Sequence, residues 1–464
     1  MTKKYLLIIL TLSLLTRFAF FGNPAETVFD EVHFGKFVSG YFTGQYFFDI
    51  HPPLGKLMIA GMAKISGFQP GFSFADIGQK FPDDSYKWLR FLPKLTGAFL
   101  PLVIFLIALE LGISQKFAFL AGLLLVFENS LLAQSRFILI DSFLLLFGFL
   151  GILFFLKHKK RQKNISHGRS FLTNSTSYLL LAGVFASLAV SIKWTGFAFL
   201  GLIGIFYLIS WIKSKEKTKS AVRGLTFLII IPSVIYFSTF AIHFSLLDKP
   251  GPGLAFHPPN FQETNILKKF AGLNLELYRS NARLGAGHPY TSQWYQWPFM
   301  NKPIYYWNSS TNSSQVSSKI YFLGNPFIWW LSTIAVIYFL ISTLKKLKSV
   351  SLNHSSRFAG SESRILDFPK QKSGLLALGY LLNLLPFIFI GRVMFLYHYL
   401  TALIFAILIL VYLLDKTKFA KNKIAFKAIL AGSIILFLFF SPLTYGLAIP
   451  EWYYKLMVWL PAWR

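Results

Sequence analysis

Long apolar runs, separated by short polar segments, dominate the pattern of this chain. An α-helix needs about 20 predominantly apolar residues to cross a bilayer. Eleven runs approach that length, at about 4–22, 90–112, 116–133, 136–156, 176–192, 194–213, 222–246, 324–345, 373–391, 394–414 and 424–446. Only the short break "QSR" separates the third run from the fourth, so their division is the least defined. The pattern predicts an all-α polytopic membrane protein of about 11 transmembrane helices, with 1–464 as one membrane-embedded domain.

The polar segments between these runs fall into two groups. Four of them carry the basic stretches "KHKKRQK", "KSKEKTKSAVR", "KKLKS" and "DKTKFAKNK", and with a cytoplasmic N-terminus all four lie on the cytoplasmic side. That distribution is the positive-inside pattern. The polar, Ser-rich segment 346–372 fits a cytoplasmic linker. Two long loops, 23–89 and 247–323, fall on the other side, where we expect the functional site of a protein in the cell (plasma) membrane.

Composition narrows the class of protein further. Hydrophobic residues make up 54% of the 464 positions and aromatic residues 18%, more apolar surface than a soluble protein of this length can bury. The net charge of +28 would suggest nucleic acid in a soluble protein, but here it follows the topology, so we expect membrane lipid and no nucleic acid as a partner. The chain has no cysteine and no metal-binding motif, and we expect neither a metal nor a cofactor.

The first long loop combines acids and histidines with aromatic residues. Its segment 28–42 has a helical period, with one apolar stripe and one polar stripe that includes Asp30 and His33. A second helix is expected to begin at "HPPLGKL", with proline in its first turn and too few apolar residues to span a membrane. The pattern predicts two helices lying on the membrane surface, with Asp30, Glu31, Asp49 and His51 beside them.

Three cations in or beside apolar runs suggest a binding site for an anion. Arg136, Lys193 and Arg392 come from three different runs, and the topology brings them to the outer membrane surface near these acids. A charge at membrane depth is costly unless it is paired or hydrated, and a phosphate suits both arginine and lysine. The alternative is that each cation reaches the interface or pairs with a structural acid.

A carboxylate above a phosphate pocket fits transfer of a group from a lipid phosphate to an external acceptor. One base that deprotonates the acceptor hydroxyl suffices, because a phosphate leaving group needs little protonation. The cations would stabilise the charge that develops on the leaving phosphate. Trp and Tyr residues in "HPYTSQWYQWPFMNKPIYYW" suit an interfacial belt, and they would also suit stacking on a sugar.

Motifs spread over 29–405 resemble those of the protein O-mannosyltransferases, of the C-type glycosyltransferase (GT-C) superfamily. They are "FDEVHFGKF", "YFFDIHPPLGKL", "QSRFILIDS", "SIKWTG", "HPYTSQWYQWP", "PIYYW", "GNPFIWW" and "RVMFLYHYL". The resemblance implies an inverting transfer of mannose from a dolichyl or polyprenyl phosphate mannose to Ser or Thr of proteins, on the extracytoplasmic side. It also implies a bacterial type of enzyme, because 247–323 lacks room for the β-trefoil MIR domain of eukaryotic members.

The resemblance also assigns roles to residues. It places the catalytic pair on Asp30 and Glu31, with Asp30 favoured as the base and Glu31 as the group that holds the acceptor; the opposite division remains open. It implies that Arg136 binds the donor phosphate, and Lys193 and Arg392 are expected there too. The residues expected to contact substrate are Asp49, His51, His288, Tyr290 and His398.

Two other functions remain open. A related transferase would use another sugar or a lipid acceptor, because pocket details decide the sugar. A transporter or lipid-carrier flippase is the third candidate. Transporters more often place ionisable, broken segments at mid-membrane in paired repeats, and the sequence has no such repeat.

Overall fold

The computed structural model describes residues 2–166, 175–283, 285, 287–309, 315–352, 372–417 and 423–464. Helices account for most of these residues. Their bounds are α1 Thr2–Phe18, α2 Glu31–Thr43, α3 Leu54–Ile65, α4 Tyr86–Glu110, α5 Gln115–Val126, α6 Asn129–Ser135, α7 Asp141–Ser166, α8 Ser175–Val190, α9 Phe197–Ile212, α10 Lys217–Leu225, α11 Ile231–Leu246, α12 Ile266–Arg283, α13 Pro326–Leu352, α15 Lys372–Leu382, α16 Leu400–Lys416, α17 Lys423–Tyr445 and α18 Glu451–Met457. The predicted linker 346–372 lies largely outside the described residues, and α13 extends into its first part.

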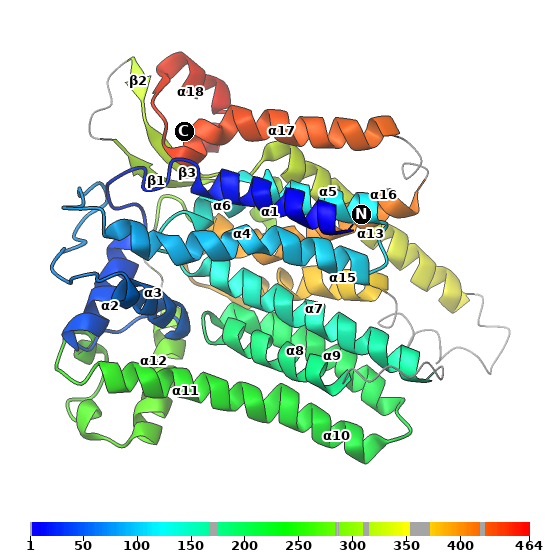
Figure 1. The fold of residues 1–464 in the computed structure, drawn as a ribbon, viewed down its shortest axis with the longest axis horizontal. Coiled ribbons are helices and arrows are strands. Elements are labelled where there is room, and N and C mark those ends of the chain that lie inside the picture. The colour runs from blue at the N-terminus through cyan, green and yellow to red at the C-terminus, as the bar shows by residue number, and fades with distance from the viewer. Residues whose placement is uncertain are drawn as a thin grey trace.

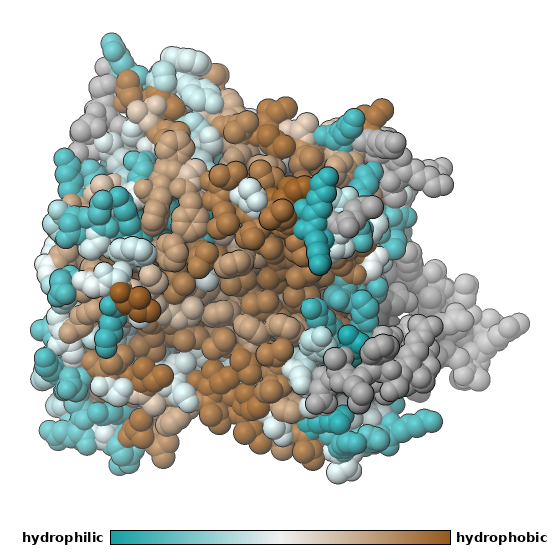
Figure 2. All heavy atoms as spheres, viewed as in Figure 1, coloured by the Kyte–Doolittle hydropathy of each residue, from teal (hydrophilic) through white to brown (hydrophobic). Residues whose placement is uncertain are grey.

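The long helices form a bundle with an apolar belt. Among the described residues, eight helices are long and apolar enough to cross a membrane, or nine if the bent pair α5 and α6 is one span. Figure 2 shows hydrophobic residues across the middle of the bundle and hydrophilic residues at both ends. The all-helical membrane class is thereby confirmed, whereas the predicted count of 11 spans is not. Part of the difference lies in α8, which is apolar but has only 16 residues.

The predicted run 116–133 is bent inside the bundle, at the junction of α5 and α6. The two helices meet at 56°. Glu128 caps the second helix, because its carboxylate accepts a hydrogen bond from the Leu131 N–H at 2.7 Å. A buried helix start needs such an acceptor for its free N–H groups. The segment 129–140 therefore turns inside the protein and brings the start of α7 to the site described below.

One end of the bundle carries the irregular structure (Figure 1). The helices α2, α3 and α12 lie there with short antiparallel strands, β1 Ile304–Asn308 paired with β3 Lys319–Phe322, and β2 Val316–Ser317 paired with β4 Ile449–Pro450. Both long loops of the sequence thus come to the same end, while the chain's N-terminus lies toward the other.

The predicted surface helices are present. The first begins at Glu31, three residues later than the periodicity indicated, because Asp30 occupies the N-cap position. Its apolar stripe is buried through Phe34, Val38 and Tyr41, while His33 remains exposed. The second, α3, has only 12 residues, as its short apolar run required. The loop that joins them, 44–53, carries the second group of acid and histidine.

Candidate functional site

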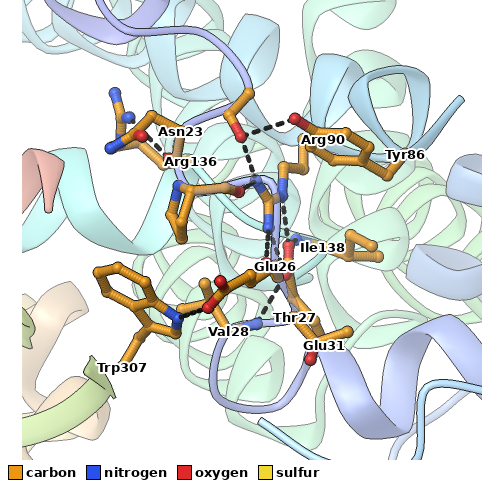
Figure 3. Close-up of polar contacts among 12 residues, drawn as sticks. Asn23, Glu26, Thr27, Val28, Glu31, Tyr86, Arg90, Arg136, Ile138 and Trp307 are labelled. Carbon is orange, nitrogen blue, oxygen red and sulfur yellow. Dashed lines mark hydrogen bonds and ion pairs between the residues drawn. The ribbon is translucent and has the colours of Figure 1, made fainter. Parts of the chain in front are cut away.

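Glu31, the first residue of α2, is fully buried against α4. Its carboxylate accepts hydrogen bonds from Arg90 at 2.6 and 2.7 Å. The backbone N–H groups of Val28 and Ile138 donate to the same two oxygens, each at 2.9 Å. Figure 3 shows Arg90 reaching Glu31 on one side and the carbonyls of the chain around Asn23 and Glu26 on the other. Four protein donors thus already occupy the Glu31 carboxylate, which has no exposed surface; its predicted contact with the acceptor stays a prediction.

The residue before Asp30 holds an unusual backbone conformation. Phe29 has a φ of 49°, in the left-handed region that a bulky side chain rarely adopts. Its N–H donates to the Tyr306 carbonyl at 3.1 Å, and its ring stacks on Tyr306 with centroids 4.1 Å apart. Backbone strain of this kind persists where surrounding contacts impose it, and it is frequent at functional sites. Through Tyr306, strand β1 thus holds the backbone from which the Asp30 side chain extends.

Asp30 itself is half-buried, and its carboxylate makes no hydrogen bond or ion pair with any described residue. Burial raises the pKa of Asp30 to about 7; Lys193 opposes this shift, while Asp141 and Asp49 add to it. A carboxylate with a pKa near neutrality and free lone pairs has the properties of a general base. The two neighbouring acids therefore differ in their hydrogen bonds: the Asp30 carboxylate has no partner among the described residues, whereas the Glu31 carboxylate accepts four hydrogen bonds.

A cavity lies near Asp30, because Lys193 and Asp141 of its lining act on the pKa of that carboxyl group. It is enclosed by α7, α12, α16 and the segments that precede α9 and α16. The lining includes two of the predicted cations and two histidines, together with other polar groups: His51, Asp141, Lys193, Trp194, Asn281, Asn383, Arg392, Tyr397, His398 and Thr401. Residues far apart in sequence thus line one cavity, among them Lys193, Arg392, His51 and His398.

Lys193 belongs to a chain of hydrogen bonds that leads back to β1. Its Nζ donates to Asp141 at 2.7 Å, and Gln134 donates to the other oxygen of Asp141 at 2.8 Å. The Tyr306 hydroxyl in turn donates to Gln134. Tyr306 is the residue on which Phe29 stacks, so a single network orients the cavity cation and the backbone that carries Asp30.

Arg392 differs from Lys193 because no acid pairs with it among the described residues. Its guanidinium donates to Asn281 at 2.5 Å and lies 3.3 Å from Nε2 of His398. Asn281 also binds the Ile50 carbonyl at 3.0 Å, which ties α12 to the loop that carries His51. A half-buried cation held by neutral groups leaves a positive charge facing the cavity, and a bound anion would neutralise it.

Arg136 does not reach this cavity. It is fully buried, and its guanidinium donates to the carbonyls of Ala19 at 2.8 Å, Phe20 at 3.1 Å and Asn23 at 3.3 Å. The Tyr445 ring lies against it at 4.5 Å. The predicted role of Arg136 at the donor phosphate stays a prediction, and its guanidinium lies outside the lining of this cavity. The guanidinium instead stabilises the turn after α1, because free carbonyls at a helix end need donors.

The two residues of the joining loop have different surroundings. His51 lines the cavity, and the pKa of its imidazole is lowered well below the usual value by burial and then by Lys193, Lys56 and Arg392. Such a ring is neutral at pH 7 and can donate or accept a hydrogen bond. Asp49 does not line the cavity; it forms a buried ion pair with Lys56. Asp49 therefore already has a charged partner, Lys56, in the absence of substrate.

The predicted contacts His288 and Tyr290 lie outside the cavity lining. His288 is exposed, and its ring meets the edge of Phe395 with centroids 5.0 Å apart. The following segment is bound to the loop of Arg392, because the Ser292 N–H donates to the Met394 carbonyl at 2.9 Å. Both residues therefore sit next to the cavity-forming loop without facing the cavity itself.

Several residues of the site had no role in the sequence-based prediction. Arg90, Lys56, Asn281 and Asp141 are partners of predicted residues, and Gln134 is a partner of Asp141. A linear sequence shows that a polar residue interrupts an apolar run, but the partner across the bundle depends on helix packing. No cluster of three or more His, Asp or Glu side chains able to hold a metal ion occurs in the described parts of the chain.

The fold and the site together define a class. A bundle of membrane-spanning helices with a polar layer at one end is also the fold of two solved structures, which this chain resembles. A solved structure of the Saccharomyces cerevisiae protein O-mannosyltransferase Pmt1-Pmt2 complex bound to the sugar donor is similar over 100% of this chain and 92% of that chain, with a TM-score of 0.88 at 20% identity. ArnT from Cupriavidus metallidurans, bound to undecaprenyl phosphate, covers 96% of this chain and 77% of its own, with a TM-score of 0.55 at 11% identity.

Sequence comparison identifies the family within this class. The family model "Dolichyl-phosphate-mannose-protein mannosyltransferase" matches residues 7–248, and "C-terminal four TMM region of protein-O-mannosyltransferase" matches 266–463. This chain belongs to the protein O-mannosyltransferase family. Protein O-mannosyltransferase 1 of Drosophila pseudoobscura pseudoobscura is 32% identical over 69% of this chain and 36% of its own length. Dolichyl-phosphate-mannose–protein mannosyltransferase 1 of Saccharomyces cerevisiae is 34% identical over 52% of this chain and 30% of its own. The chain thus spans about a third of the length of these relatives.

Proposed function

We propose that this protein transfers mannose from a polyprenyl or dolichyl phosphate mannose to Ser or Thr hydroxyls of protein acceptors, with inversion at the anomeric carbon. The observation that carries the proposal is the free carboxylate of Asp30 beside a cavity lined by Lys193 and Arg392. Base and anion site are the two groups that this reaction requires. The names of the relatives, which are dolichyl-phosphate-mannose–protein mannosyltransferases, supply the sugar and the acceptor class.

The donor phosphate would occupy the cavity between Lys193 and Arg392. Arg392 lacks an acidic partner among the described residues, so the phosphate would be its counter-ion. Lys193 is already paired with Asp141, which holds its ammonium group in place rather than leaving it mobile. Preorganised donors of this kind stabilise charge that develops in the transition state without reorganisation. His51 and His398, as neutral hydrogen-bonding groups, would contact the sugar or the phosphate.

The reaction then needs one displacement. The acceptor oxygen attacks the anomeric carbon on the face opposite the phosphate, the bond from that carbon to the phosphate oxygen breaks, and polyprenyl phosphate leaves with the bonding electrons. The proton of the hydroxyl passes to Asp30. We assign Glu31 a positioning role, because its pairing with Arg90 fixes the start of α2 and so the place of Asp30.

The proposed location follows from charge and architecture. The basic runs mark one end of the bundle as cytoplasmic by the positive-inside pattern, so the site would lie at the extracytoplasmic end of a cell-membrane protein. The two long loops, 23–89 and 247–323, would then be external, and the acceptor would approach from outside. Sugar identity rests on the family, and a related transferase with another sugar or a lipid acceptor is the alternative outcome of the test.

The test uses purified protein in detergent with defined polyprenyl phosphate sugars and a Ser/Thr peptide. We expect mannose to appear on a hydroxyl, located by mass spectrometry of the product, with the wild-type chain and not with Asp30→Asn. Incorporation of another sugar, or of mannose into lipid only, would overturn the proposal in favour of the alternative transferase. Equal transfer by Asp30→Asn would remove the assignment of the base.

A further inference from the structure

A second, larger hollow lies outside the cavity, on the face of α2 that does not pack against the bundle. This groove has a volume of about 530 Å³, within the range of about 300–1,000 Å³ typical of ligand sites. Its walls come from α2, from the segment after the helix, and from two loops that are distant in sequence. Its lining residues are Lys36, Phe37, Ser39, Gly40, Thr43, Gln45, Phe47, Phe48, Pro70, Gly71, Phe72, Ser73, Pro252, Gly253 and Phe256.

Aromatic rings form the walls of this groove. Phe37 stacks on Phe47 with centroids 4.7 Å apart, and Phe48 stacks on Phe256 at 4.4 Å. Gly44, with a φ of 76°, ends α2 in the left-handed conformation that glycine adopts readily and turns the chain back along the groove. The outer wall is open to solvent, since Phe256 is 50% exposed. Aromatic-lined grooves of this shape bind extended, proline-containing peptides, which lose little conformational entropy on binding.

The groove is continuous with the candidate active site along one face of α2. Asp30 lies at the start of this helix, and at helical spacing His33, Lys36, Phe37 and Gly40 follow on the same side. His33 and Lys36, which lie between the free carboxylate and the groove along this side of α2, are both exposed to solvent. At 1.5 Å per residue, the groove begins about 9 Å and ends about 20 Å from Asp30. An extended chain at about 3.3 Å per residue covers this distance in three to six residues.

We propose that this groove binds the acceptor polypeptide itself, at residues three to six positions away from the Ser or Thr that is modified. This inference rests on the proposed function, in which Asp30 receives the proton of that hydroxyl. A proline or large apolar side chain of the acceptor would pack against the aromatic rings that line the groove. Lys36 is the one charged side chain among the residues that line the groove, so an acidic residue in this part of the acceptor would strengthen binding. The groove would make acceptor choice depend on sequence at a distance from the modified residue.

The test compares Phe256→Ala with wild type on two kinds of acceptor at saturating donor. The short acceptor is a blocked tripeptide with a central Thr. The long acceptors extend it by six residues, with proline and Leu at the third to sixth positions, on the amino side in one series and on the carboxyl side in the other. Ile65→Ala is the control, because Ile65 is an exposed apolar residue of α3, 83% accessible, that does not line the groove.

We expect wild type and Ile65→Ala to prefer one long series over the tripeptide through a lower KM, and Phe256→Ala to lose about tenfold in kcat/KM on that series alone. Lys36→Glu should in addition reverse a preference for an acidic over a basic flanking residue, by a few-fold. An equal effect of Phe256→Ala on long and short acceptors, or no effect on either, would overturn the groove assignment while leaving the proposed function intact. Failure of wild type to modify even the tripeptide and the long acceptors would instead contradict the proposed function.

Discussion

Glu31→Gln and Asp30→Asn both replace a carboxylate by an amide, at neighbouring residues. The structure predicts that the first lowers the stability of the fold and that the second does not. In Glu31→Gln, one of the two carboxylate oxygens becomes an NH₂ group that faces N–H donors from Arg90 and the backbone. The positive charge of Arg90 also loses its counter-ion in a site with no exposed surface. Breaking a buried ion pair in this way costs about 3–5 kcal/mol. We therefore expect a marked loss of stability and, with it, a loss of transfer.

Asp30→Asn should retain or gain stability while transfer is abolished. The folded protein raises the pKa of Asp30 to about 7 from a usual value near 4, so the folded state binds its proton more tightly than the unfolded chain does. Ionisation of Asp30 consequently destabilises the fold as pH rises through this range. A neutral amide avoids that cost at pH 8, where wild type carries a half-buried, unpaired carboxylate.

Thermal unfolding in detergent at pH 6 and pH 8, combined with the mannose transfer assay, separates the two variants. Glu31→Gln is expected to unfold several degrees below wild type at both pH values. Asp30→Asn is expected to unfold at a higher temperature than wild type at both pH values, and by a larger margin at pH 8, because stability is lost between the unfolded and folded pKa values of Asp30. A Glu31→Gln protein that unfolds like wild type but no longer transfers mannose would refute the positioning role and restore Glu31 to the acceptor site.

Three further predictions concern the pH profile and the cations. Transfer by wild type should rise with pH, with kcat/KM increasing below pH 7 and levelling above it as Asp30 loses its proton; a flat profile between pH 5.5 and 8 would exclude this base. Arg392→Met should weaken binding of polyprenyl phosphate by about 10–100-fold in a direct titration, since a charge-assisted contact contributes about 1.5–3 kcal/mol; unchanged affinity would place the phosphate elsewhere. Arg136→Ala should cost about 3 kcal/mol of stability through its lost carbonyl contacts, with donor KM unchanged; the reverse result would return Arg136 to the donor site.

Much of the architecture could be predicted from the sequence because lipid imposes simple rules. A backbone in hydrocarbon must satisfy its own hydrogen bonds, so apolar runs become helices. The same reasoning placed α2 and α3 on the surface, because their apolar stretches are too short to span. The count of spans was less secure, since α5 and α6 are bent at an internal cap on Glu128 that acts only in the folded bundle.

The candidate site was likewise predictable from the sequence only in part. The sequence by itself determined that Lys193 and Arg392 would come to one depth beside the acids of the first loop, because a charge in an apolar run must find water or a partner. It could not determine the direction of each side chain. Only the tertiary structure decided that Arg136 turns toward the carbonyls after α1, and that Arg90 occupies Glu31 while Asp30 stays free. The physical reason is that a buried charge loses its hydration and therefore needs a partner, which the sequence reveals. Which residue becomes that partner depends on how the helices pack.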